Sequence, residues 1–215
     1  MFSFQTILDH LPTLIWSARF TLLISVLGCA LGLAMGGFIC IAAVSRSPVL
    51  RAAAALYVSF FRGVPLLIQL LLFYYLLPLI GLNVPALVAA VLTVGLCAAA
   101  YISEILRGAL NAIPRGQSEA AVAIGFSPFD LWTRILLPQA LKIGTPALVN
   151  ELILLVKASS LVTVVGIVEI TRMSQSIASA TYRPLEIYLA AAFLYLAINL
   201  VIAASGRALE RRLAT

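Results

Sequence analysis

Five apolar stretches, each long enough to cross a bilayer, constrain this chain more than any other feature. They cover residues 20–44, 55–80, 84–106, 143–166 and 186–206. A helix needs roughly 20 apolar residues to cross the hydrocarbon core, and backbone polar groups there must be satisfied within the helix. With 63% hydrophobic and 10% charged residues, the chain lies outside the range of soluble globular domains. We therefore expect an all-α, polytopic membrane protein with five transmembrane helices.

No shift in composition, low-complexity run or convincing internal repeat divides the chain, so residues 1–215 are interpreted as a single transmembrane domain. Residues 1–18 precede the first apolar stretch and are expected to form an interfacial segment. The first stretch is not expected to be a cleaved signal peptide, because it is longer than an h-region and lacks a clear small-x-small cleavage site.

The basic residues mark the ends of the apolar stretches, and the positive-inside rule uses them to set orientation. With five spans, one side of the membrane receives Arg46, Arg51, Arg107, Arg115, Arg134, Lys142, Arg207, Arg211 and Arg212. The other side receives Asp9, His10, the charge-free turn 78–85 and the segment that holds Arg172 and Arg183. This bias predicts an external N-terminus and a cytoplasmic C-terminus. The basic residues are not clustered with interleaved aromatics, so no nucleic-acid partner is expected.

The sequence predicts no catalytic residue and no metal site. Cys29, Cys40 and Cys97 lie in apolar runs without metal-ligand spacing and are interpreted as buried small side chains. His10 is the only histidine, which makes a His-based metal cluster or a Ser-His-Asp hydrolase implausible. The sequence G-x-x-x-x-G-K-[ST] does not occur, so the chain has no P-loop of its own.

Ionisable side chains within apolar stretches mark either a solute pathway or a structural ion pair. Glu104 lies three residues before Arg107, a helical-neighbour spacing that favours a structural pair. Glu151 follows Asn150 about nine residues into the fourth stretch, where a solute role and a structural role are equally plausible. Lys157 lies six residues beyond Glu151 and is assigned less securely to the same pathway.

Two glycine features bear on helix packing. Gly28, Gly32 and Gly36 form a small-xxx-small face that lets another helix approach closely. We favour packing within the subunit over a subunit interface. In the second stretch, residues 60–65 combine glycine with proline, so a kink is expected near Arg62. Arg62 could contact a solute there or extend to the cytoplasmic interface.

Residues 116–138 are expected to form a compact cytoplasmic loop of two short helices that meet at Gly125. Ser118 can cap a first helix that begins at Glu119, and Gly125 can end it. Residues 127–130 resemble a capping box with proline at the first helical position.

The loop also contains a long gapped motif. Glu119-Ala120-Ala121 is followed after three residues by Gly125, and after nine more by Ile135 and Leu137-Pro138. This pattern resembles the EAA signature of bacterial ABC-importer permeases, and every fixed position of that signature is present at the right spacing. An interfacial helix that merely rests on lipid is the alternative that the full spacing disfavours.

The chain as a whole resembles the permease subunits of the polar amino-acid uptake family of ABC transporters. Beyond the EAA loop, the resemblance rests on residues 61–69, 100–109, 113–117, 150–161 and 181–184. It implies the type I importer fold, a bacterial inner-membrane location, a second permease, a cytoplasmic P-loop ATPase dimer that binds ATP and Mg, and an external solute-binding protein.

By the same resemblance, the ATPase would act on the loop residues Glu119, Ala120, Ala121, Gly125, Phe126 and Ser127. The solute, a polar amino acid, would pass near Asn150 and Glu151. Two alternatives remain open: a stand-alone gradient-driven carrier, and a mainly structural half of a heterodimeric permease.

Overall fold

The computed structural model describes residues 2–214, which form helices joined by short connections and contain no strand. In chain order the elements are α1 (Phe4–Ala43), α2 (Pro48–Gly63), α3 (Leu66–Leu79), α4 (Ala86–Asn111), α5 (Arg115–Ala123), α6 (Pro128–Asp130), the π-helix η1 (Leu131–Leu136), α7 (Leu137–Ala158), the 3-10 helix η2 (Ser159–Val165), α8 (Ile170–Thr181) and α9 (Pro184–Ala214). The predicted all-α class is confirmed.

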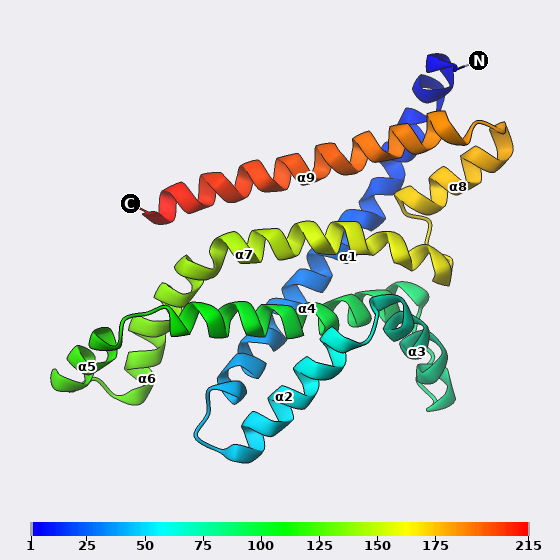
Figure 1. The fold of residues 1–215 in the computed structure, drawn as a ribbon. Helices are drawn as coiled ribbons and strands as arrows, with labels where there is room; N and C mark the ends of the chain where they lie inside the picture. Colours follow the sequence, from blue (N-terminus) through cyan, green and yellow to red (C-terminus); the bar gives the residue numbers. More distant parts are fainter. Residues whose placement is uncertain (1, 215) are drawn as a thin grey trace.

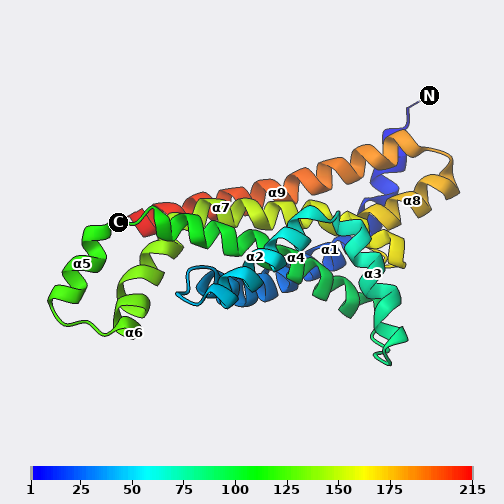
Figure 2. The same cartoon turned by 60° about the horizontal axis from the view of Figure 1, so that its bottom comes forward.

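Four helical segments of the described chain are long and apolar enough to cross a membrane: α1, α4, the run from α6 to η2, and α9. A fifth span exists only if α2 and α3 count as one, and these two helices meet at 105°. The N-terminus and α8 lie at one end of the molecule, whereas the C-terminus, α5 and α6 lie at the other (Figures 1 and 2). The prediction of five spans therefore holds with a strongly bent second span.

The α1–α4 contact is the most extensive helix packing in the described chain, and glycines make it possible. A Cβ added at Gly32 would lie 2.7 Å from Cβ of Ala98, and one at Gly36 would lie 2.9 Å from the backbone oxygen of Ala99. Only residues without a side chain permit backbones to approach this closely. The expectation that the glycine face packs within the subunit is confirmed.

The corner between α2 and α3 follows from Pro65. A proline has no N–H to donate, so the carbonyl of Phe61 loses its helical partner and the helix breaks. The buried Gln69 side chain replaces that donor: its Nε2 lies 2.9 Å from the Phe61 oxygen and 2.7 Å from the Val64 oxygen. The predicted kink is confirmed in position, and the structure shows that Gln69 fixes it.

The N-terminal segment differs from the expectation. Residues 4–18 are the first part of the continuous helix α1, so no separate segment 1–18 exists within the described chain. The reason is local: Ser3 caps the helix by accepting a hydrogen bond from the Thr6 N–H, and the helix then continues through Pro12. Whether these residues lie in the interface stays a prediction.

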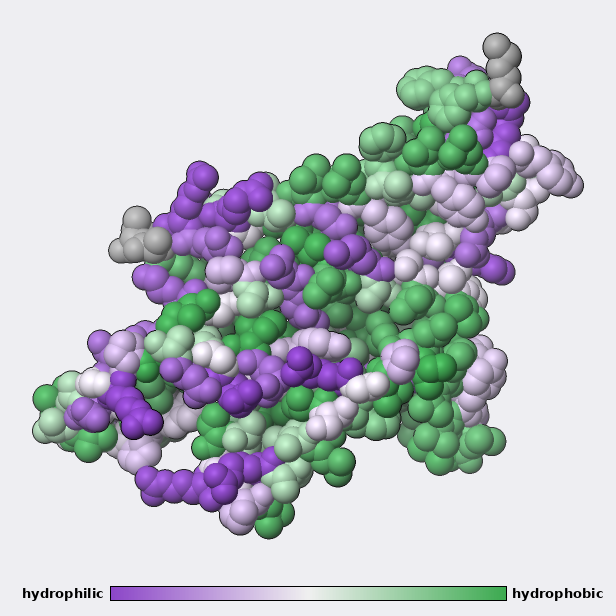
Figure 3. Space-filling model, in the orientation of Figure 1, coloured by the Kyte–Doolittle hydropathy of each residue, from purple (hydrophilic) through white to green (hydrophobic). Residues whose placement is uncertain are grey.

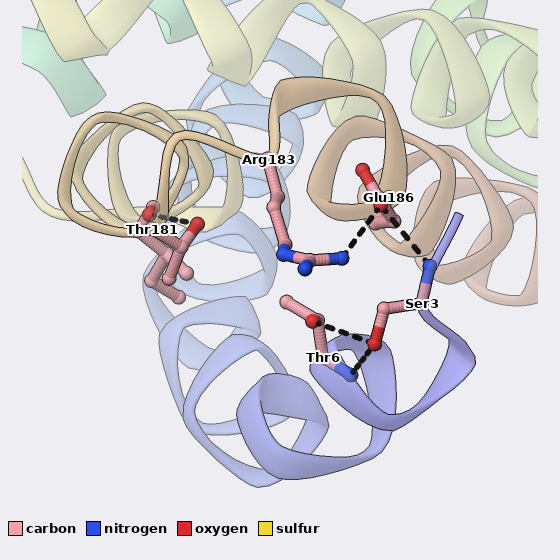
Figure 4. A network of polar contacts seen from close by, with 6 residues as sticks. Ser3, Thr6, Thr181, Arg183 and Glu186 are labelled. Atoms are coloured by element: carbon pink, nitrogen blue, oxygen red, sulfur yellow. Dashed lines mark hydrogen bonds and ion pairs between the residues drawn. The ribbon is translucent and has the colours of Figure 1, made fainter. Parts of the chain in front are cut away.

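Two polar contacts fasten the end of the molecule that carries the N-terminus. The Ser3 N–H donates to Oε1 of Glu186 at 3.2 Å, and Arg183 approaches the same oxygen at 3.3 Å (Figure 4). At the other end of α8, the fully buried Glu169 accepts from the N–H groups of Thr171 and Arg172. It also accepts from the Tyr195 hydroxyl at 2.9 Å. Burial raises the pKa of the Glu169 carboxyl, and these hydrogen bonds oppose the shift.

Candidate functional site

The loop formed by α5, α6 and η1 projects from the end of the molecule opposite the N-terminus (Figures 1 and 2). We call residues 115–136 the α5–α6 loop. Gly125 has φ +86, a backbone conformation that glycine adopts without a steric penalty. The N–H groups of Gly125 and Phe126 donate to the carbonyls of Val122 and Ala121. This pattern is a Schellman motif, which satisfies the last carbonyls of α5.

The second helix of the loop begins as the sequence predicted. The Ser127 hydroxyl accepts from the Asp130 N–H at 3.1 Å and donates to the Asp130 carboxylate at 2.6 Å, and Pro128 occupies the first helical turn. Asp130 also pairs with Arg134 at 3.0 Å. The Ser127 N-cap and the bend at Gly125 are therefore confirmed, and the Asp130 carboxylate binds the Ser127 hydroxyl rather than the Ser127 N–H of a full capping box.

Two details of the loop prediction are wrong. Helix α5 begins at Arg115, not Glu119, because Pro114 supplies the start, so Ser118 lies inside the helix and does not cap it. The second helix is also not short, since it runs through the π-helix η1 into α7 and on to Val165. The π-turn immediately precedes Pro138, whose ring and missing N–H disfavour regular α-helical bonding there.

The α5–α6 loop exposes an apolar surface. Val122, Ile124 and Phe129 are 61%, 74% and 76% exposed, whereas Ala121 is buried where α5 contacts η1. The predicted coupling residues divide accordingly: Ala121 is buried, Phe126 is half-buried, and the others are exposed, namely Glu119, Ala120, Gly125 and Ser127. A rigid, projecting turn with exposed apolar side chains has the form of a protein contact site.

Apart from the α5–α6 loop, a cluster of charged side chains lies on α2 and α4. The Arg107 guanidinium makes two hydrogen bonds to the Glu104 carboxylate, at 2.9 and 2.6 Å, and Arg62 lies 3.9 Å from the same carboxylate. The Arg62 guanidinium also lies 5.4 Å from the centre of the Tyr101 ring, within cation–π range. The structure thus confirms the predicted Glu104–Arg107 pair and joins Arg62 to it.

This charged cluster is partly open to its surroundings. The Arg62 side chain is 47% exposed and that of Glu104 is 26% exposed. Glu104 and Arg107 line a cavity of about 390 Å³ together with Arg51 and Ser59. Hydrophilic residues gather over the middle of the face seen in Figure 3, and hydrophobic residues cover the side where α3 lies. Exposed charge at this position along a membrane span is costly unless it lines a polar pathway or meets a partner.

The predicted residues of the fourth span do not form one cluster. Glu151 is only 6% exposed and lies in electrostatic range of Cys29 on α1 and Cys97 on α4, so it faces the interior of the subunit. Its carboxyl makes no hydrogen bond or ion pair with another described residue. Asn150 and Lys157 are exposed and point away from that interior. The rotation of α7 separates these side chains.

Two residues of the polar regions were missed from the sequence. Tyr101 lies within a motif that was recognised, but its contact with Arg62 depends on how α2 packs against α4. Gln69 carried a usable signal, because a polar residue one turn after an apolar X-Pro break is placed to satisfy the free carbonyls.

Among residues 2–214, no group of three or more His, Cys, Asp or Glu side chains could hold a metal ion.

Comparisons with known proteins agree with this architecture. Residues 36–215 match the family described as binding-protein-dependent transport system inner membrane component. The chain is 38% identical over 211 residues to the arginine transport system permease protein ArtQ of Bacillus subtilis, covering 98% of this chain and 96% of ArtQ. It is 37% identical over 214 residues to the glutamine transport system permease protein GlnP of Escherichia coli K12, covering 99% and 98%.

Solved structures share the fold along nearly the whole chain. A structure described as an amino acid ABC transporter with histidines superposes with a TM-score of 0.90 at 34% identity, covering 99% of both chains. A MetNI methionine ABC transporter in an inward-facing conformation gives 0.75 at 23% identity, which shows the fold alone. The family match, the near full-length relatives and the helical architecture agree: this chain belongs to the family of inner membrane components of binding-protein-dependent transport systems.

Proposed function

We propose that this chain is the membrane-spanning subunit of an ATP-driven importer that carries polar amino acids into the cytoplasm. The single observation that carries the proposal is the α5–α6 loop: a Schellman turn at Gly125 presents exposed apolar side chains at the tip of a projecting element. The energy would come from a separate cytoplasmic ATPase that binds ATP and Mg. A second permease and an external solute-binding protein would complete the complex.

The helical connection from the loop into the membrane supports a mechanical role. Helix α6 continues through η1 into α7 without a break in the chain of helical turns. A displacement of the loop by the ATPase would therefore move the cytoplasmic end of the fourth span. The exposed tip residues would form the contact, and the buried Ala121 would keep α5 fixed against η1.

The substrate class is proposed from two observations. The relatives named above are described as arginine and glutamine transport proteins, whose names point to amino acids with polar side chains. The partly exposed cluster of Arg62, Glu104 and Arg107 would give such a solute a polar wall. We propose a pathway along this face, with Asn150, Glu151 and Lys157 as further candidates on the fourth span.

The orientation follows from the distribution of basic residues along the fold. The end that carries the α5–α6 loop also carries the C-terminus, with Arg207, Arg211 and Arg212 near it (Figure 1). By the positive-inside rule this end would be cytoplasmic. The N-terminus and α8 would lie outside, where a solute-binding protein could reach them.

Substitution of Gly125 by Asp tests the coupling role. Asp at φ +86 would cost about 1–2 kcal/mol locally and add a charge at the tip. No atom lies within 4 Å of the added Cβ, so the rest of the subunit should be unaffected. We expect ATP-driven uptake of amino acids into proteoliposomes to be lost while the permease still inserts.

Gly81→Asp is the matched control, because Gly81 has φ +84, equally open surroundings and a position in the turn between α3 and α4. It should show the same local strain and retain uptake. Normal uptake in the Gly125→Asp complex would refute the coupling role.

A second candidate, the mainly structural half of a heterodimer, is favoured by one observation: Glu151 is buried among the helices of its own subunit. Glu151→Gln distinguishes the two, since Gln keeps the shape and removes the charge. If Glu151 acts on the solute, the apparent affinity for the solute should change by roughly tenfold, about 1.4 kcal/mol. Unchanged uptake, affinity and specificity in the assembled complex would exclude a solute role for Glu151.

A further inference from the structure

An apolar cavity of about 390 Å³ lies where α1 and α4 end beside the α5–α6 loop. Its walls include Phe38 and Ile41 of α1, Leu106 and Leu110 of α4, and Trp132 of η1. Among the residues that line it, only Thr133 carries a hydroxyl group. The cavity is open to the surroundings of the subunit beside the last turns of α1 and α4.

A polar cavity of about 470 Å³ adjoins it and shares two of its walls, Leu110 and Trp132. Arg115, Asn111 and Ser118 line this second cavity, and no acidic residue does. The two cavities together present an apolar groove that leads past an indole ring to a guanidinium and an amide. The indole itself is of the kind enriched where the hydrocarbon meets the headgroups.

We propose that the two cavities bind one anionic phospholipid, with an acyl chain in the apolar groove and the phosphate headgroup beside Arg115. The apolar cavity corresponds to the acyl chain, and the polar cavity corresponds to the headgroup. The positive charge of Arg115 at the polar end complements the negative phosphate. An acyl chain has no polar group to satisfy, so it fits walls whose one hydroxyl, that of Thr133, already donates to the Phe129 carbonyl. A peptide segment in the same groove would leave backbone N–H and C=O groups without partners.

The assignment to the inner leaflet rests on the proposed orientation, in which the α5–α6 loop is cytoplasmic. Anionic lipids give that leaflet its negative surface potential, and each basic residue near the surface contributes about fivefold in affinity. Bound there, the lipid would touch α1, α4 and η1 at once. It would therefore brace the base of the α5–α6 loop.

The chain provides its own reporter for this site. It has two tryptophans, Trp16 and Trp132, and Trp16 lies far along α1 beside Arg19. Two complexes are compared, both with Trp16→Phe and one of them also with Trp132→Phe. The difference between their fluorescence emission is the signal of Trp132, because tryptophans of the partner subunits contribute equally to both. The assembled complex is reconstituted in phosphatidylcholine vesicles that contain a minor fraction of lipid brominated on the acyl chains.

We expect brominated phosphatidylglycerol to quench Trp132 at about fivefold lower mole fraction than brominated phosphatidylcholine with the same chains. Arg115→Ala should abolish this preference, and Arg207→Ala, an exposed residue outside both cavities, should preserve it.

A second variant fills the groove without disturbing the fold. A Cβ at Gly37 meets no atom within 4 Å, and Gly37 lines the apolar cavity, so Gly37→Phe should reduce quenching by both brominated lipids. Gly108→Phe, at an equally open glycine that does not line the groove, is the matched control.

Equal quenching by the two lipids in proportion to their mole fraction would mean ordinary contact with the bilayer, and would overturn the proposal. Absence of quenching by either would also overturn it, because a protein surface would then cover the groove. The measurement needs no ATP or solute. Loss of uptake with the lipid preference intact would count against the proposed function alone.

Discussion

Two of the breaks between helices, the α2–α3 corner and the α5–α6 loop, satisfy their backbone carbonyls in different ways. At the α2–α3 corner, Pro65 removes a donor and the buried Gln69 side chain supplies the replacement. At the α5–α6 loop, the turn around Gly125 satisfies its own carbonyls through backbone N–H groups. The corner thus depends on one buried side chain of α3, whereas the loop closes through its own backbone and exposes Val122, Ile124 and Phe129. A self-contained break is suited to meeting a partner.

The largest effect on stability is expected from Gln69→Leu, which removes the side-chain donor at the α2–α3 corner. Leu fills the space but donates no hydrogen bond, so the Val64 carbonyl would lose this donor and the Phe61 carbonyl would keep only the weak donor of the Cys97 thiol at 3.7 Å. Each buried acceptor that loses its donor costs about 1–3 kcal/mol. We expect a lower thermal unfolding temperature for the purified permease in detergent.

Gln69→Glu is the companion variant, since it keeps the shape and changes the donor into an acceptor. It should destabilise at least as much as the Leu variant. A stability equal to that of the natural protein in both variants would show that Gln69 does not hold the corner.

A smaller and more local effect is expected at two adjacent glycines of α1. A Cβ at Gly36 would lie 2.9 Å from the Ala99 backbone oxygen, whereas one at Gly37 meets no atom within 4 Å. Gly36→Ala should cost about 1–3 kcal/mol by overpacking. Gly37→Ala should be neutral or stabilise by up to about 1 kcal/mol, because Ala is the better helix former.

The two variants differ only in whether the added methyl group faces α4, because both changes add one methyl group to neighbouring positions of one helix. Thermal unfolding of the two variants side by side gives the difference directly. Equal stabilities would contradict the close α1–α4 packing described above.

The sequence anticipated those features that depend on local chemistry. Pro65, the Gly125 turn and the Ser127 cap each follow from the covalent nature of one residue, so their positions could be predicted. The glycine face of α1 was equally visible, because its four-residue spacing defines one side of a helix. The loop motif, together with the other stretches that resemble the family, predicted the family that the comparisons show.

Features that depend on packing could not be predicted. The 105° angle at the α2–α3 corner depends on how α3 packs against α4, and a sequence pattern marks only the break. The burial of Glu151 depends on the rotation of α7 about its axis, which neighbouring helices determine. The early start of α5 was missed because Ser118 suggested a cap, whereas Pro114 is the N-cap and the helix begins at Arg115.

The central claim, that the exposed tip of the α5–α6 loop contacts the ATPase, is tested most directly by cross-linking. A cysteine at Ile124, which is 74% exposed, is placed in a background with the three native cysteines replaced by alanine. Ser179→Cys, exposed on α8 at the other end of the molecule, is the control. Membranes that contain the whole complex are treated with a short bifunctional reagent, and products are identified by mass spectrometry.

We expect a cross-linked product of the permease and a P-loop ATPase from the Ile124 cysteine and none from the Ser179 cysteine. Absence of an ATPase product from Ile124, in membranes where the ATPase copurifies with the permease, would contradict it.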